Sequence, residues 1–207
     1  MKTKAGNDSE EDLRIAKAVL KEIGDEAFIR PDANCGYGPE EALPLLKKLS
    51  DLGVRYYEDP CAWKHTEALN EIRSETDIKI LINMGFRTPT EVRQILNSET
   101  ADFLMPDTPV SGGIHKVAEL TRVATAWNIP CLMHCSHDLG LKTAAITQIA
   151  AGIPNFSGPN DTCYHGLIDD IITQPFQFED GKLRVPEGPG LGVEVDEHKL
   201  EKYKVSS

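Results

Sequence analysis

The chain has 207 residues, a length that suits one large domain or two small ones. Its 22 Lys and Arg side chains stand against 33 Asp and Glu side chains, which gives a formal net charge of −11. DNA and RNA are poor partners for such an acidic surface, because binding them depends on cationic side chains that neutralise phosphates. An anionic small molecule is compatible with it, since a local cation or a bound metal reverses the field at a site.

Three further properties bear on where the protein is found. No apolar run approaches the roughly 18 residues that span a bilayer. Residues 1–6 do not resemble a signal peptide, because no apolar segment follows the basic residues. The 5 cysteines form no CxxC pair, and an odd number without metal-type spacing suggests reduced thiols. We therefore expect a cytoplasmic protein that has no membrane partner.

Apolar, β-prone runs recur along the chain and predict strands. Their starts lie about 25 residues apart, the length of one strand plus one crossover helix. Amphipathic segments between them predict helices, several of which begin at a capping residue or a proline. The predicted strands cover residues 27–30, 54–57, 78–82, 103–105 and 129–133. The predicted helices cover residues 9–23, 39–52, 88–96, 117–124 and 139–151, and the last is so apolar that we expect it to be buried.

This alternation of strands and helices predicts an α/β fold with a parallel sheet, either doubly wound or closed as a barrel. The turn after the first predicted strand reads Arg-Pro-Asp-Ala-Asn over residues 30–34 and lacks the glycines of a dinucleotide-binding fingerprint. A Walker P-loop and a Gly-x-Ser-x-Gly elbow are also absent from the sequence. These absences disfavour the common nucleotide-binding and hydrolase families.

Each predicted strand is followed by a chelating or ionisable side chain. Asp32, Glu58 and Asn83 follow the first three strands and would offer three oxygen ligands. Oxygen ligands with open positions suit Mg²⁺. In a (β/α) barrel, the carboxyl ends of the strands are where active sites are built. Any one of these residues alone is an ordinary turn former. Three of them, each at the end of a successive predicted strand, favour a metal site.

Asp107 and His134 follow the last two predicted strands. A carboxylate beside an imidazole fixes its tautomer and makes a proton-transfer dyad. The alternative is a surface Asp and a core His with no shared role. His137 and His165 compete for the same position, but neither directly follows an apolar run, so we prefer His134.

Lys2 and Lys4 lie two residues apart at the N-terminus. On a strand they would point to the same face. In a frayed terminus, which is the default expectation, they would have no role.

In this order, these residues resemble the enolase superfamily, and specifically the C-terminal barrel domain of its mandelate racemase and muconate lactonizing enzyme group, closest to the glucarate dehydratase branch. The similarity covers essentially the whole chain. Each motif is weak alone, whereas the ordered set is specific. The matching motifs are Lys2-Thr3-Lys4, Asp32-Ala33-Asn34, Glu58-Asp59-Pro60, Asn83, Asp107 with Gly112-Gly113, His134 and the segment Pro189-Gly190-Leu191-Gly192-Val193.

The resemblance implies an incomplete TIM-type (β/α) barrel that lacks the capping domain and the first strand. Residues 1–175 would form the partial barrel and carry the active-site motifs. Residues 176–207 would be a C-terminal extension that packs against the capping domain.

The resemblance also implies a magnesium site formed by Asp32, Glu58 and Asn83. An Asn as third ligand, where most relatives have an acidic residue, points toward glucarate dehydratases. Asn34 and Asp161 are implied to contact the substrate.

The implied catalytic residues are Lys4, Lys2, His134 and Asp107. Lys4 would be the base on one face of the substrate carbon, with Lys2 beside it as a like charge. His134, paired with Asp107, would be the acid or base on the opposite face. Superfamily members use such a base together with Mg²⁺ to form an enediolate.

The function implied is dehydration of a small acid sugar, an aldarate or aldonate. The enzyme would remove the α-proton and then expel the β-hydroxyl with help from protonated His134. Glucarate dehydratases usually carry an Asn two residues after the dyad His, where this chain has Ser136. A racemase or epimerase of a 2-hydroxy acid therefore stays open, as does a non-catalytic barrel fragment. The family often forms oligomers, so a homo-oligomer is a further expectation.

Overall fold

The computed structural model describes residues 1–24 and 26–205, which form two compact units. Unit 1 comprises residues 1–105 and 122–130. Unit 2 comprises residues 106–121 and the chain from residue 131 onward. Each unit has its own buried apolar residues, such as Leu46 and Ile80 in unit 1 and Met133 and Ile149 in unit 2.

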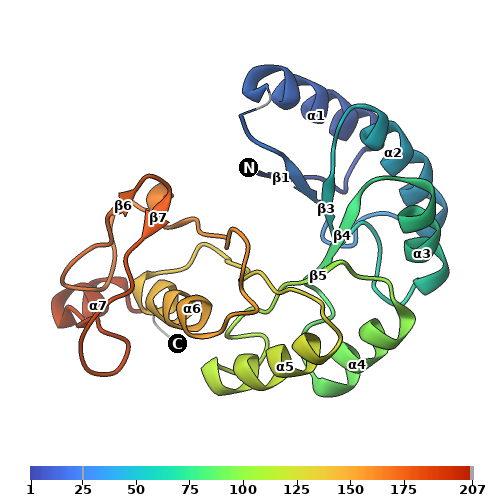
Figure 1. The fold of residues 1–207 in the computed structure, drawn as a ribbon. Helices are drawn as coiled ribbons and strands as arrows, with labels where there is room; N and C mark the ends of the chain where they lie inside the picture. Colours follow the sequence, from blue (N-terminus) through green and yellow to red (C-terminus); the bar gives the residue numbers. More distant parts are fainter. Residues whose placement is uncertain (25, 206–207) are drawn as a thin grey trace. The chain divides into compact units, whose positions relative to one another are not determined.

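Unit 1 contains a parallel sheet of five strands in the order β1-β2-β3-β4-β5, as the alternation in the sequence predicts. Sequential strands are neighbours, and each connection from β1 to β5 carries a helix (Figure 1). The register aligns Lys4 with Asp32 and Asp32 with Glu58, so the charged strand ends lie at one level. The strands are β1 (Lys2–Lys4), β2 (Arg30–Asp32), β3 (Tyr56–Glu58), β4 (Lys79–Ile82) and β5 (Phe103–Leu104).

Two helices of unit 1, α1 and α4, begin at residues whose side chains cap the helix N-terminus. Asp8 accepts hydrogen bonds from the backbone of Glu10 and Glu11 at the start of α1, and Thr88 forms a capping box with Glu91 at the start of α4. Helix α5 (Ile114–Ala126) begins in unit 2 and ends in unit 1. The others are α1 (Ser9–Ile23), α2 (Pro39–Asp51), α3 (Thr66–Glu75) and α4 (Pro89–Ser98).

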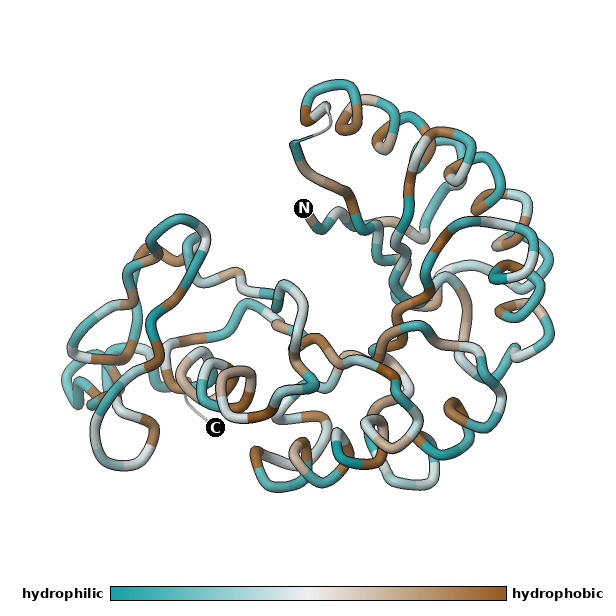
Figure 2. The backbone as a smooth tube through the Cα atoms, in the orientation of Figure 1, coloured by the Kyte–Doolittle hydropathy of each residue, from teal (hydrophilic) through white to brown (hydrophobic). Residues whose placement is uncertain are grey.

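The core of unit 1 lies between the sheet and its helices. Hydrophobic positions follow the strands and alternate with hydrophilic ones along the helices, as Figure 2 shows. Leu45, Leu46 and Leu49 of α2 are at most 2% exposed, and Ile80 and Leu81 of β4 are fully buried. Burial on this scale contributes about 1.5–3 kcal/mol for each such side chain.

Several features of the fold differ from the sequence prediction. Residues 2–4 form strand β1, whereas a frayed terminus was the default expectation. Helix α3 was not predicted, because Leu69 and Ile72 are the apolar residues it buries and two residues define no clear period. The predicted strand over residues 129–133 is wrong: only Cys131 forms an isolated bridge there. Pro130 lacks an N–H for a sheet ladder, and the Cys131 N–H donates to the carbonyl of Asn155 at 3.2 Å.

Unit 2 is built around α6 (Gly140–Gly152), whose buried Ala144, Ile146 and Ile149 confirm the prediction of a buried helix. A Cβ at Gly140 would collide with Asp170, whose carboxylate accepts the Gly140 N–H at 2.9 Å. The remaining elements are the turn η1 (Tyr164–Gly166), the antiparallel hairpin β6 (Phe178–Glu179) and β7 (Lys182–Leu183), and helix α7 (Glu197–Tyr203).

The segment from residue 176 onward belongs to unit 2. Gln148 of α6 donates to the carbonyls of Pro186 and Leu191 at 2.8 and 3.3 Å, which attaches this segment to the helix. Its contact with a capping domain stays a prediction. Across residues 1–24 and 26–205, no helix is both long and apolar enough to cross a membrane.

Asp102, the residue before β5, bonds to two other elements of unit 1, α3 and β4. Its carboxylate accepts two hydrogen bonds from the Arg73 guanidinium of α3, at 3.0 and 3.1 Å, and one from the Ile80 N–H of β4 at 2.9 Å. Burial opposes the charge on Asp102, but the bonds from Arg73 and Ile80 hold the pKa of its carboxyl below 3.8.

We expect Asp102→Asn to lower the free energy of unfolding by about 2 kcal/mol at neutral pH, because hydrogen bonds to charged groups contribute about that much. The pKa of Asp102 is lower in the folded chain than its ordinary value of 3.8. This contribution to stability is therefore fully present above pH 3.8, and it is lost as the pH falls through the pKa of the folded state. Urea unfolding followed by circular dichroism at neutral and acidic pH measures both effects. Glu75→Gln, which removes the exposed ion pair of α3 with Lys47, is the control and should cost less than about 1 kcal/mol.

Candidate active site

Lys2 and Lys4 lie on β1 and point to the same face, as their spacing on a strand predicts. Both ammonium groups contact Oδ2 of Asp32, at 3.0 Å from Lys2 and 2.5 Å from Lys4. Asp32 itself is fully buried. The first strand thus places two cations against the carboxylate that ends the second.

Glu58, at the end of β3, is also fully buried and lies between two cations. Lys2 donates to its Oε1 at 2.9 Å, and Nε of Arg30 lies 3.2 Å from its Oε2. The sequence reasoning missed Arg30. It lies two residues before Asp32 on the same strand, so strand alternation alone could have placed it on this face.

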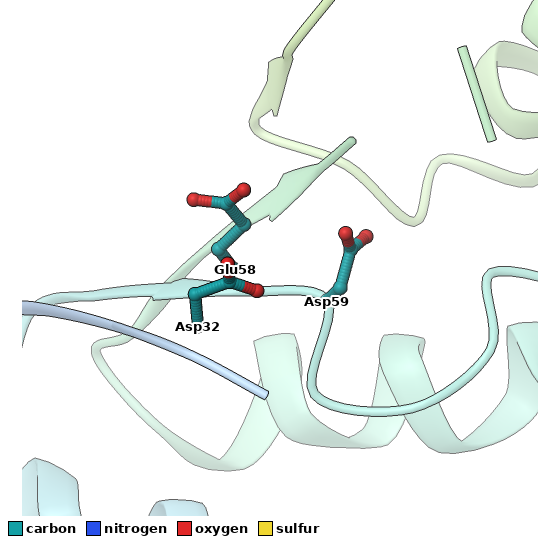
Figure 3. Close-up of side chains that lie close together, drawn as sticks. All are labelled: Asp32, Glu58 and Asp59. Carbon is teal, nitrogen blue, oxygen red and sulfur yellow. The ribbon is translucent and has the colours of Figure 1, made fainter. Parts of the chain in front are cut away.

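A third carboxylate completes a cluster at the ends of β2 and β3. Asp32, Glu58 and Asp59 each offer one oxygen, and these atoms all lie within 4.8 Å of one another (Figure 3). Consecutive residues of a strand point to opposite faces, but Asp59 has φ 43°, which ends the strand and breaks that alternation. Buried carboxylate oxygens at this spacing fit a hard divalent cation such as Mg²⁺.

Asp59 also holds the start of the loop after β4. Its two carboxylate oxygens accept the backbone N–H groups of Asn83 and Met84, each at 3.1 Å. The amide nitrogen of Asn83 donates to the Met105 carbonyl at 2.8 Å, which leaves Oδ1 as the Asn83 atom suited to a cation. Asn83 as a metal ligand stays a prediction, and Asp59 is the neighbouring carboxylate that the sequence reasoning did not assign to the site.

The protonation of the cluster depends on its cations. Burial opposes ionisation of Asp32, but Lys2 and Lys4 hold the pKa of its carboxyl below the ordinary value. Burial raises the pKa of Glu58, with Asp32 adding to the effect and Lys2 opposing it. Burial and the charge of Glu58 raise the pKa of Asp59 well above its ordinary value. Added positive charge would favour the ionised form of all three, so the cluster is electrostatically suited to a divalent cation.

Asn34 lies beside the exposed end of this cluster. Its Oδ1 accepts a hydrogen bond from Lys4 at 2.7 Å, and its N–H donates to Asp32 at 3.0 Å. A left-handed backbone conformation, φ 47°, turns the chain here. The structure therefore places Asn34 next to Lys4, and its contact with substrate stays a prediction.

In unit 2, the predicted pairing of Asp107 with His134 is present. Nδ1 of His134 lies 2.9 Å from Oδ2 of Asp107, and both residues are buried. The His134 N–H donates to the Pro106 carbonyl at 3.0 Å, which aligns the two segments. The competing residues His137 and His165 are both exposed.

Lys142 is a third member of this group that sequence reasoning missed. Its ammonium lies 2.7 Å from Oδ1 of Asp107 and 2.7 Å from Oδ1 of Asp138. Ser136 donates to the other oxygen of Asp107 at 3.2 Å. Against the effect of burial, His134 and Lys142 hold the pKa of Asp107 below its ordinary value. The available signal was that Lys142 is the one charged residue in the otherwise neutral α6.

Asp161 lies in an irregular segment of unit 2, where its N–H donates to the Met133 carbonyl at 3.0 Å. A cavity of about 440 Å³ opens beside it, lined by Asp138, Thr147 and Phe178 among others. Its contact with substrate stays a prediction. The carboxylate cluster lies wholly in unit 1, and the dyad lies wholly in unit 2.

Residues 1–199 match the family model described as "Enolase C-terminal domain-like". The chain belongs to this family. Its fold is accordingly the TIM-barrel-like α/β domain of the enolase superfamily, which confirms the fold class that the sequence predicted. An isomerase from Streptomyces coelicolor A3(2) has a similar solved structure, with a TM-score of 0.87 and 30% identity, over 98% of this chain and 53% of that one.

Curated relatives have several activities. A probable glucarate dehydratase from Streptomyces coelicolor is 29% identical over 92% of this chain and 43% of its own length. An N-succinyl-L-Arg/Lys racemase from Bacillus cereus is 27% identical over 99% of this chain and 55% of its own length. Muconate and chloromuconate cycloisomerases also match. The chain spans about half the length of these relatives.

We expect Mg²⁺ to raise the thermal unfolding midpoint if the cluster binds it. A ligand that binds the folded state stabilises it by about 1.4 kcal/mol at a tenfold excess over its Kd. Differential scanning fluorimetry with and without Mg²⁺ measures the shift, which Asp32→Asn and Glu58→Gln should each remove.

Asp51→Asn is the matched control, because Asp51 is an exposed acid at the end of α2. Its Mg²⁺ shift should equal that of the unmodified chain. Equal shifts in all three variants would show that the cation binds elsewhere.

We expect Lys142→Met to destabilise unit 2, because it leaves Asp107 and Asp138 buried with one cation fewer. Removing one partner of a buried ion pair costs about 3–5 kcal/mol. Lys116→Met is the control, since Lys116 makes an equally short 2.7 Å pair with Glu119 on an exposed helix face. The free energy of unfolding of that variant, measured with denaturant, should fall by less than about 1 kcal/mol. Equal losses in the two variants would contradict the importance of burial.

Proposed function

We propose that the chain carries the barrel part of a Mg²⁺-dependent acid-sugar dehydratase. The observation that supports this most is the buried pair Asp32 and Glu58 with Lys4 beside it. Together they offer oxygen ligands for a cation and an amine that can act on a bound anion. The dehydratases among the relatives, including arabinonate and D-xylonate dehydratases, favour this reaction class.

Asp32, Glu58 and Asn83 would hold the Mg²⁺, which when bound supplies positive charge that stabilises the developing anion of a carboxylate substrate. Asp59 supports them by fixing the backbone of Asn83. The substrate is in this proposal a small acid sugar, whose carboxylate makes the adjacent carbon acidic enough for an amine base once its charge is neutralised.

The two lysines have different roles in the proposed reaction. The Lys4 side chain is 66% exposed, whereas that of Lys2 is 23% exposed and lies between Asp32 and Glu58. Lys4 can therefore reach a substrate and remove the α-proton. Lys2 keeps the two carboxylates in place and contributes a like charge next to Lys4.

The dyad supplies the acid for the second half of the reaction. Asp107 engages Nδ1 of His134, and the proposal assigns proton transfer to the other ring nitrogen, Nε2. In the proposed step, Nε2 of protonated His134 gives its proton to the β-hydroxyl, the carbon–oxygen bond breaks and water leaves. The resulting enol takes up a proton on carbon, releases the proton of its hydroxyl group and so becomes a 2-keto-3-deoxy acid.

Racemisation or epimerisation of a 2-hydroxy acid is the second candidate. Ser136, two residues after the dyad His, donates to Asp107, and the Bacillus cereus racemase is a relative of similar identity. In that reaction Lys4 and His134 would exchange protons with opposite faces of one carbon, and no hydroxyl would leave. A third reading is a non-catalytic fragment, because the chain spans about half the length of its relatives. A homo-oligomer and a cytoplasmic location stay predictions.

We expect the chain with Mg²⁺ to exchange the α-proton of at least one aldonate or aldarate with D₂O and to form a 2-keto-3-deoxy acid. Proton NMR follows exchange, and a carbonyl reagent detects the product. Lys4→Ala should abolish both, because it removes the base. His134→Asn should abolish product formation while exchange continues, because the acid acts after the α-proton has left.

The other readings give different outcomes. Inversion of the α-carbon without a keto acid identifies a racemase or epimerase. A non-catalytic fragment is identified if Mg²⁺ raises the thermal unfolding midpoint of the folded chain but no aldonate or aldarate tested exchanges its α-proton with D₂O. Lys17→Ala, which removes an exposed lysine of α1, is the control and should keep full exchange.

A further inference from the structure

Two cysteines of unit 2 lie in segments that run side by side. The Asp161 N–H donates to the Met133 carbonyl at 3.0 Å, and the Met133 N–H donates to Oδ1 of Asn160 at 2.7 Å. Cys135 and Cys163 each follow the bonded residues Met133 and Asp161 by two positions, so they continue the same alignment. Their sulfur atoms lie 3.3 Å apart.

The surroundings of the two thiols suit oxidation better than those of the buried cysteines. Cys135 and Cys163 are both partly exposed, whereas Cys61 and Cys131 are at most 1% exposed. A disulfide needs its sulfurs at about 2.05 Å, so the two atoms must approach by little more than 1 Å. The paired segments already hold the backbone on both sides in place.

We propose that Cys135 and Cys163 form a reversible disulfide when the protein meets a peroxide. The proposal rests on the contact between the two thiols and not on the proposed dehydratase activity. It assigns a redox modification site to the segment that directly follows His134.

The chemistry balances with hydrogen peroxide as the oxidant. The Cys163 sulfur attacks one peroxide oxygen, the O–O bond breaks, hydroxide leaves, and the thiol proton converts it to water. The sulfenic acid on Cys163 is then attacked by the Cys135 sulfur, the S–O bond breaks, a second water leaves and the S–S bond forms. Two thiols thus lose two protons and two electrons to one peroxide.

The order of attack follows from the environment of Cys135. Burial and the contact with Cys163 raise the pKa of Cys135 to about 12. A thiol that stays protonated is a poor first nucleophile. The proposed scheme therefore gives the first attack to Cys163 and the resolving attack to Cys135, an order that the single cysteine variants test.

The bridge would close a loop that contains α6 between two segments of functional interest. It would join the residue after His134 to the residue two positions after Asp161. A cross-link between distant residues restricts the unfolded chain and so stabilises the fold. We expect the oxidised chain to have a thermal unfolding midpoint several degrees above that of the reduced chain.

Peroxide treatment of the native full chain tests the site. After quenching and denaturation, maleimide should label three of the 5 free thiols rather than all of them, and dithiothreitol should restore full labelling. Mass spectrometry should find one cross-linked pair of peptides, with fragment ions that place the bond between Cys135 and Cys163. Cys35→Ser is the control, since Cys35 is a partly exposed thiol of unit 1, and this variant should still form the bridge.

Two single variants test the order of events. In Cys135→Ser, dimedone should trap sulfenic acid on Cys163; in Cys163→Ser, it should label Cys135 much less. The proposal is overturned if peroxide leaves all thiols of the unmodified chain open to labelling, or if the bond joins another pair. Absence of a dimedone adduct on Cys163 in Cys135→Ser would overturn the proposed order.

Discussion

The buried carboxylates Asp32 and Glu58 are the constraint on which unit 1 depends. An isolated buried charge is costly, and a cationic partner with good geometry offsets that cost. Lys2, Lys4 and Arg30 provide such partners, and all three come from β1 and β2. The parallel register of the first three strands is therefore tied to charge neutralisation as well as to apolar packing.

The same carboxylates thus belong both to the ion pairs of the fold and to the proposed cation site. Two of the carboxylates that could hold a cation, Asp32 and Glu58, already pair with lysines, so a bound cation would share them with existing ion pairs. In unit 2 the charges are arranged the other way round, because one cation, Lys142, lies between two carboxylates, Asp107 and Asp138. Asp107 is also paired with His134. In both units a shared carboxylate sets the geometry of a basic side chain.

Sequence reasoning predicted the alternating fold and much of the candidate site, because both follow from local periodicity. Asp32, Glu58 and His134 each follow an apolar run. Asp59 and Lys142 were missed for physical reasons: a positive φ overrides strand alternation at the first, and the second reaches Asp107 from a helix. The strand prediction at residues 129–133 failed because apolar composition says nothing of the N–H that proline lacks.

Gly140 and Asp170 have a consequence for how the sequence can change over time. Any side chain at position 140 would occupy the space of the Asp170 carboxylate, which also accepts the hydroxyl of Tyr164 at 2.6 Å. Neither residue can be replaced alone without losing a buried hydrogen bond or creating an overlap. A Cβ at position 140 would also overlap the Ile172 side chain. Among descendants of this sequence, a larger residue at position 140 should therefore be accompanied by smaller residues at both positions 170 and 172.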